Sequence, residues 1–296
     1  MSTHRYLLLL LLIPGLLGAR CGPGHRLEPK PTRQISETLS LPQNARRIEI
    51  QFHEGLLTLE PGAEIRCRVQ VGLQANDEES LTLLAASIAT RVESLPGNVT
   101  RLTVPLPTGQ PMDAVHTTWR MAVPTGTDIV VKTRKGSVEC RGLNGNLTVE
   151  GGSGRINARR ASGHADLSTT SGELRLRGNY SSARATSLRG RVAVELPPHQ
   201  DNDRLELQVA NDSGNTYLDL QEKQRFELFF KGEEQQLQLD PTVRVNWTQG
   251  RPNRELLEGE IGDLQAPVSS GEIRLSTEQS VQVRTRPQAT AAGRDR

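Results

Sequence analysis

Pairs of apolar residues recur every nine positions along the middle of the chain. In each pair the two residues stand two apart, as expected for a short strand with one buried face. The pairs are Val138/Cys140, Leu147/Val149, Ile156/Ala158, Ala165/Leu167, Leu174/Leu176, Ala183/Ala185 and Val192/Val194. Between them stand small or polar residues typical of turns. The pattern predicts an all-β region built from repeated short strands.

Glycines mark the corners of the repeat. One set recurs in every second unit, at Gly136, Gly154, Gly172 and Gly190, and a second set interleaves at Gly145 and Gly163, with Ser181 in the next place. We expect these glycines to supply the positive φ of a sharp corner. Two nine-residue units per turn predict a parallel β-solenoid with about 18 residues and two short strands per turn. A left-handed hexapeptide helix is disfavoured, because the apolar positions recur at nine and not at six.

The predicted stack has two interior columns. Val138, Ile156, Leu174 and Val192 would lie above one another on one wall, and Leu147, Ala165 and Ala183 on the opposite wall. Bulky residues facing mostly small ones would allow a thin core to close.

The segment GGSGRINARR (151–160) resembles the glycine-rich unit of calcium-loaded β-rolls. In those proteins the sixth residue of each unit is an aspartate that binds the ion. Here that place holds apolar residues throughout, and Asp166 falls one position later, where it would point outward. We therefore expect no calcium site, no other metal ion and no cofactor.

The flanking segments differ from the repeat. Alternating residues between Ile48 and Val71 predict strands, and Asn76 with Glu79 forms a predicted capping box for a helix. Its apolar stripe runs from Leu81 to Val92, and Pro96-Gly97 would end it. We assign 35–120 to an N-terminal strand–helix–strand cap and 121–286 to the solenoid, regular over 133–196 and looser over 197–286. Residues 287–296 are a predicted disordered tail.

The N-terminus has the features of a targeting segment. A basic residue at Arg5 precedes the apolar stretch Leu7–Leu17, which is shorter than the ~20 residues that span a bilayer. Residues 1–20 are thus a predicted signal peptide, and 21–34 a flexible tether. Cys21 stands where a bacterial lipoprotein carries its lipid, although Arg20 departs from the small residue usual before that cysteine. A membrane-anchored lipoprotein facing the periplasm or cell surface and a soluble periplasmic or secreted protein both remain open.

Charge and aromatic content argue against two classes of function. The 296-residue chain has a net charge of +2, which gives no strong attraction to nucleic acid. Aromatic residues make up 3%, a low content for a polysaccharide enzyme that stacks sugars on flat rings. Cys67 and Cys140 lie on strand patterns as candidate buried thiols, and a disulfide between them remains open.

The stretch RMAVPTGTDIVVKTRKGSVECRGLNGNLTVEGGSGRIN (120–157) resembles the bacterial putative-adhesin family of unknown function. The match is carried by Val123-Pro124-Thr125-Gly126 and by Thr133–Val138, within a resemblance that covers about residues 35–285. It implies a β-solenoid at the cell envelope, often anchored by a lipid. The family supplies no catalytic residues.

Three function classes follow. The favoured one is a non-enzymatic envelope protein, either an adhesin or a surface-binding or spacer module. The second is a polysaccharide-active β-helix enzyme, for which the outward Glu139, Glu173 and Glu195 share one wall but lie in different rows and rungs. The third is a regulatory partner in envelope stress that would bind through the helix at 77–94.

The outward face of the repeat carries an unusual column of arginines. Arg141, Arg159 and Arg177 hold the same position in alternate units and would lie one above another, with Arg175 beside them. Like charges in register on neighbouring strands are unfavourable, although exposed charges tolerate it in water. We interpret these four residues as a candidate site for an extended polyanion such as an anionic glycan, because bidentate arginine suits phosphate and carboxylate.

Overall fold

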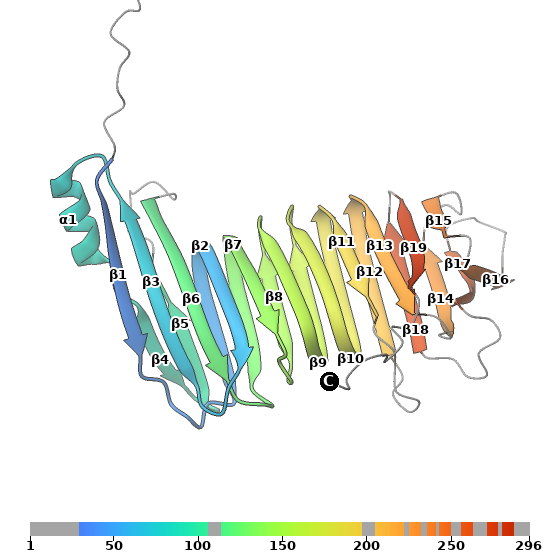
Figure 1. The fold of residues 1–296 in the computed structure, drawn as a ribbon, viewed down its shortest axis with the longest axis horizontal. Coiled ribbons are helices and arrows are strands. Elements are labelled where there is room, and N and C mark those ends of the chain that lie inside the picture. The colour runs from blue at the N-terminus through green and yellow to red at the C-terminus, as the bar shows by residue number, and fades with distance from the viewer. Residues whose placement is uncertain are drawn as a thin grey trace, which may run out of the picture.

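The structure, a computed structural model, describes residues 30–105, 114–196, 205–221, 225–231, 236–240, 243–249, 256–262, 271–277 and 280–286. These residues form one 19-stranded sheet and a single helix, so the predicted all-β class is confirmed. Strands stack side by side along the long axis, with α1 at one end and β14–β17 at the other (Figure 1). The predicted signal peptide, Cys21 and the C-terminal tail lie outside the described residues and stay predictions.

The repeat folds as a stack of parallel strands. These are β7 (Asp128–Arg141), β8 (Leu147–Gly151), β9 (Arg155–Thr169), β10 (Glu173–Arg189) and β11 (Val192–Glu195). The partners stand two nine-residue units apart, as in Ile129 with Leu147 and Leu174 with Val192. The interval predicted from the glycines is therefore the register of these strand pairs.

Each long strand crosses two walls. We call the wall that contains Val138, Ile156, Leu174 and Val192 the arginine wall, and the one that contains Leu147, Ala165 and Ala183 the opposite wall. Both sets pair in register as predicted, and all seven side chains are buried. The two apolar columns form one thin core between the walls.

The prediction of positive φ is correct for half of the corner glycines. Gly145, Gly154 and Gly163 have positive φ, but Gly136, Gly172 and Gly190 do not. A Cβ on Gly172 would lie under 3.0 Å from the carbonyl oxygen of Gly154, one turn earlier in the stack. Close approach of successive backbones, and not backbone conformation, requires glycine at Gly172 and Gly190.

Threonine hydroxyls accept a backbone hydrogen bond at two of these corners. The backbone N–H of Gly136 donates to Thr133 Oγ1 at 2.9 Å, and that of Gly172 donates to Thr169 Oγ1 at 3.1 Å. Threonine commonly satisfies a backbone donor in this way where the chain turns. The motif Thr-x-x-Gly thus specifies a corner with a satisfied amide.

The N-terminal part joins the same sheet. Its strands are β1 (Thr32–Leu39), β2 (Arg47–Pro61), β3 (Arg66–Gln74), β4 (Arg91–Leu95), β5 (Val99–Thr103) and β6 (Val115–Val123). β1 begins inside the segment predicted as a tether. β2 lies between β7 on one side and β5 and β6 on the other, and is parallel to all three. Beyond them β3, β1 and β4 pair antiparallel, so the stack ends in antiparallel strands.

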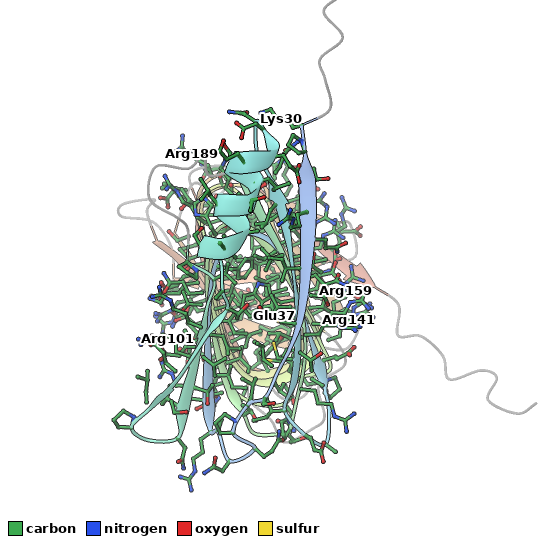
Figure 2. All side chains as sticks on the ribbon, turned by 90° about the vertical axis from the view of Figure 1, so that its left-hand side faces the viewer. Lys30, Glu37, Arg101, Arg141, Arg159 and Arg189 are labelled. Carbon is green, nitrogen blue, oxygen red and sulfur yellow. The ribbon has the colours of Figure 1, made fainter. Side chains whose placement is uncertain are left out.

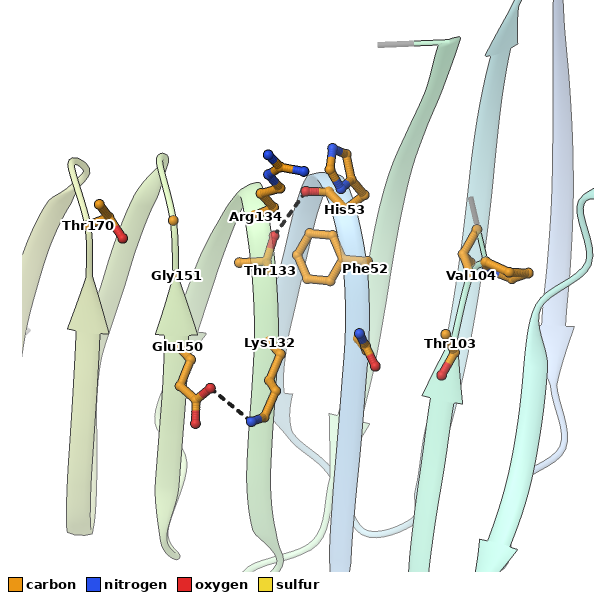
Figure 3. Close-up of a pocket in the computed structure, with 13 residues that line it drawn as sticks. Phe52, His53, Thr103, Val104, Lys132, Thr133, Arg134, Glu150, Gly151 and Thr170 are labelled. Carbon is orange, nitrogen blue, oxygen red and sulfur yellow. Dashed lines mark hydrogen bonds and ion pairs between the residues drawn. The ribbon is translucent and has the colours of Figure 1, made fainter. Parts of the chain in front are cut away.

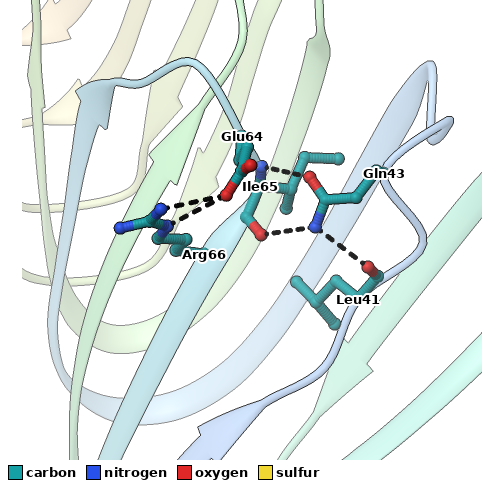
Figure 4. A network of polar contacts seen from close by, with 5 residues as sticks. All are labelled: Leu41, Gln43, Glu64, Ile65 and Arg66. Carbon is teal, nitrogen blue, oxygen red and sulfur yellow. Dashed lines mark hydrogen bonds and ion pairs between the residues drawn. The ribbon is translucent and has the colours of Figure 1, made fainter.

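A glutamine holds the connection between β1 and β2 (Figure 4). Gln43 Oε1 accepts the backbone N–H of Ile65 at 2.8 Å, while its Nε2 donates to the carbonyl oxygens of Ile65 at 3.0 Å and Leu41 at 3.3 Å. The side chain thereby acts as a short strand partner for the start of β3.

The helix is shorter than predicted and begins one residue later. α1 spans Glu78–Ser87, and its N-cap is Asp77, whose carboxylate accepts the backbone N–H of Ser80 at 2.7 Å. The predicted capping box of Asn76 and Glu79 is therefore wrong. Leu81 and Leu84 are buried, but Ile88 is already extended and Val92 lies on β4, where pairing with β5 overrides the helical pattern. The predicted contact helix at 77–94 is likewise wrong in its extent.

The C-terminal part continues the stack less regularly. Its strands are β12 (Leu205–Ser213), β13 (Thr216–Gln221), β14 (Arg225–Lys231), β15 (Leu237–Leu239), β16 (Arg244–Gln249), β17 (Leu256–Gly262), β18 (Gly271–Thr277) and β19 (Val281–Arg286). β18 and β19 insert between β12/β13 and β14/β15, all in parallel. β17 pairs antiparallel with β14 and with β16. This end also departs from the predicted all-parallel order.

The two described cysteines are free and buried. The register places Cys67 opposite Met121, Met121 opposite Leu59, and Leu59 opposite Cys140. Three strand spacings amount to roughly 14 Å, well beyond the ~7 Å limit of a disulfide. Burial raises the pKa of each thiol to about 12. The thiols are therefore protonated core residues and do not pair.

Candidate functional site

The predicted arginine column lies on the outer face of the arginine wall. Arg141 pairs with Arg159, and Arg159 with Arg177, so the three side chains occupy one column. Arg175 stands beside them, because Leu174 and Leu176 on the same strand point inward. Seen along the long axis, Arg141 and Arg159 lie together on one side and Arg101 on the other (Figure 2).

The column changes character toward the C-terminus. Beyond Arg177 it continues through Glu195, Asp219 and Arg284, each pairing with the one before. A neighbouring outward column runs from Asn157 through Arg175 and Ala193 to Tyr217. The two columns together form a mixed surface in which arginine dominates.

Three of the four predicted arginines are ion-paired. Arg141 contacts Glu139 at 3.0 Å, Arg175 contacts Glu173 at 2.8 Å, and Arg177 contacts Glu195 at 3.2 Å. Each arginine side chain is more than 40% exposed, so these are surface pairs worth about 0–1 kcal/mol. An incoming anion could therefore replace the carboxylate at little cost.

Other arginines on this face contact neutral groups. Arg159 Nε donates to Asn157 Oδ1 at 2.9 Å, and Arg284 Nη2 donates to Gln282 Oε1 at 3.0 Å. The guanidinium carbon of Arg191 lies 4.2 Å from the centroid of the Tyr217 ring, a cation–π contact. These three contacts are to uncharged groups.

The positive charge of the arginine wall lowers the pKa of one carboxyl group, that of Glu173. Burial pushes the pKa of Glu173 up, but the hydrogen bond and charge of Arg175, with the charges of Arg155 and Arg191, outweigh it and leave the pKa below its ordinary value. Glu173 is ionised at neutral pH and bridges Arg175 and Arg155, the latter at 2.9 Å.

A hollow of about 300 Å³ opens where these columns meet. Its lining contains five arginines and two carboxylates, namely Arg159, Arg175, Arg177, Arg191 and Arg284 against Glu195 and Asp219. Ala193 and Tyr217 lie among them. The arrangement can bind an anionic group through several guanidinium donors at once.

The carboxylates considered for an enzyme do share this wall. Glu139, Glu173 and Glu195 are distributed over different columns and rungs, as expected, and each is ion-paired with an arginine. Among the described residues, no group of three or more histidines, cysteines and acidic residues could hold a metal ion.

A second cleft, of about 530 Å³, lies on the opposite wall and its upper corner (Figure 3). Lys132 there is ion-paired with Glu150 at 2.9 Å. Burial, with the charges of Arg134 and Lys135, lowers the pKa of His53 below its ordinary value, so the imidazole is neutral at pH 7. The cleft thus presents less net positive charge than the hollow, and it adjoins Pro105 at the end of a described range.

Arg191, Tyr217 and Arg284 also belong to the site, although they were not predicted from the sequence. Aligning Gly214 with Gly190 would have placed Tyr217 beside Ala193, because DSGNTYLDL (212–220) restates the repeat. Arg284 had no such signal, since β19 follows β13 in the stack only after the intervening β14–β18 segment.

Within the part of the chain that the structure covers, no helix has the length and apolar character needed to cross a membrane.

No family model and no curated protein matches the chain. A putative cell adhesion protein from Clostridium sporogenes is 12% identical with a TM-score of 0.34, covering 86% of this chain and 100% of its own. A putative adhesin from Bacteroides fragilis is 11% identical with a TM-score of 0.41, covering 86% and 97%. A putative lipid binding protein from Parabacteroides distasonis is 10% identical with a TM-score of 0.29, covering 85% and 94%. Similarities this low say nothing about ligands.

Proposed function

We propose that the protein is an exported, non-enzymatic binding module of the bacterial cell envelope. In this proposal a rigid parallel β-solenoid, with two nine-residue units per turn, presents the arginine wall to an acidic polysaccharide. The register of two units between Ile129 and Val192, interrupted only by a one-residue shift at Gly178–Tyr180, supports the solenoid. A stack of bonded strands is a stiff support, so side chains on successive rungs keep a fixed spacing.

The observation that carries the proposal is the hollow with its five arginines. It adjoins the predicted column of Arg141, Arg159 and Arg177, whose cationic groups recur at strand spacing, about 4.8 Å. An extended polymer with an anionic group on each unit could contact several of them at once. A single small anion would use only part of this surface.

Binding to polysaccharides of different charge tests the proposal. We expect the purified protein to bind immobilised polygalacturonate at low salt and not to bind neutral dextran. Binding should weaken steeply as salt rises, because exposed charges are screened over ~8 Å at physiological ionic strength. Equal binding to the two polymers, or binding that is insensitive to salt, would contradict a charge-based site.

A further inference from the structure

The hollow on the arginine wall has a gap at one position of an otherwise bulky column. Arg175 pairs with Ala193, and Ala193 pairs with Tyr217. The strands that carry Arg175 and Tyr217 are two spacings apart, roughly 9.5 Å. In this column only the methyl group of Ala193 lies between them, with Arg191 and Glu195 on either side of it along the chain, which leaves a slot.

Cationic groups surround this slot on several sides. Arg175 and Arg177 line it from β10, Arg191 lies over the ring of Tyr217, and Arg284 lines it from β19. Arginine donors at several angles suit a carboxylate or a phosphate, which accepts bidentate hydrogen bonds.

The remaining walls of the slot carry two carboxylates, Glu195 and Asp219, and two uncharged groups. The Tyr217 ring forms one side and the Ala193 methyl group the floor, and both are half-buried. A volume of about 300 Å³ lies at the lower end of the range for small-molecule pockets. A bare inorganic anion would leave much of this space unused, whereas a sugar ring would fill it.

We infer that the slot over Ala193 binds one sugar unit that carries a carboxylate or a phosphate. This inference rests on the proposed function and adds a specific subsite to it: the arginine column attracts the polymer, and the slot selects a unit of suitable size and charge. The acidic group contacts the guanidinium groups of Arg177, Arg191 or Arg284, and the ring of the sugar packs beside Tyr217.

Three sugars that differ only at C6 test the inference, namely galacturonate, galactose 6-phosphate and galactose. Binding is measured by titrating each sugar into the protein at low salt, with saturation-transfer NMR as the readout. We expect the wild-type protein to bind the acidic sugars and not galactose. The stronger of the two acidic sugars shows whether the slot prefers a carboxylate or a phosphate.

Filling the slot provides the matched variant. Ala193→Leu places three further carbon atoms in the gap, and we expect it to weaken binding of the preferred acidic sugar at least tenfold. Ala210→Leu is the control, because Ala210 is an equally half-buried, outward alanine on β12 of the opposite wall. It should bind as wild type does. Circular dichroism melts of both variants show whether the fold is retained.

The inference is overturned if Ala193→Leu binds the acidic sugars as tightly as wild type. It is also overturned if galactose binds as well as the acids, or if wild type binds none of the three. These results leave the proposed function standing as long as polygalacturonate still binds wild type. If the wild-type protein does not bind polygalacturonate, both the proposed function and the inferred sugar site are refuted.

Discussion

Replacing Gly172 by alanine is expected to destabilise the protein by about 3 kcal/mol or more. The added Cβ would lie under 3.0 Å from the carbonyl oxygen of Gly154, and the residues that follow the two glycines, Arg155 and Glu173, pair in parallel. Since neither strand can move without breaking that pairing, the substitution must distort the stack. The free energy of unfolding, from urea titration followed by circular dichroism, measures the effect.

Gly72→Ala is the matched control for this effect. Gly72 lies on β3, and the nearest atom to its added Cβ is the carbonyl oxygen of His116 at 3.7 Å, an ordinary contact. We expect this variant to be as stable as wild type or slightly more stable, because alanine reduces the freedom of the unfolded chain. If both variants unfold at the wild-type midpoint, the close stacking of the corners is incorrect.

The triple variant Arg159→Ser/Arg177→Ser/Arg284→Ser is expected to lose tenfold or more of its affinity for polygalacturonate at low salt. These residues belong to one outward column and line the hollow. Each exposed charge contact contributes up to about 1 kcal/mol, so three together account for a loss of this size. The fold should survive, because all three side chains are exposed.

An equal change of charge on the opposite wall serves as the control. Arg101, Arg184 and Arg274 also belong to one outward column, which passes through Glu49, Asp166 and Gln208. Their replacement by serine removes the same number of positive charges as the first variant does. If this control loses as much affinity as the first variant, binding depends on net charge alone and the arginine wall is not the site.

The repeat could be predicted from the sequence because the alternation within each nine-residue unit shows which of its residues face the core. Leu174 and Leu176 must point inward for a strand with one buried face, which places Arg175 and Arg177 outside. Stacking at an interval of two units then brings Arg159 and Arg177 together. These inferences need only local alternation and a constant period.

Strand order outside the repeat could not be predicted in the same way. β2 inserts between β6 and β7, although β6 and β7 are neighbours along the chain, and β18 and β19 insert between β12/β13 and β14/β15. Alternation shows which face of a strand is buried but does not identify its partner. For that reason Arg284 was not predicted as part of the site. The predicted helix was also too long, because Val92 pairs with β5 in a strand.

The most direct test of the binding site is chemical footprinting of arginines with phenylglyoxal in the presence of polygalacturonate, with mass spectrometry as the readout. We expect the bound polymer to protect Arg159, Arg177 and Arg284, while Arg101, Arg184 and Arg274 on the opposite wall react at the rate seen without it. Equal protection of both walls, or protection confined to the opposite wall, would contradict the assignment of the arginine wall as the binding surface.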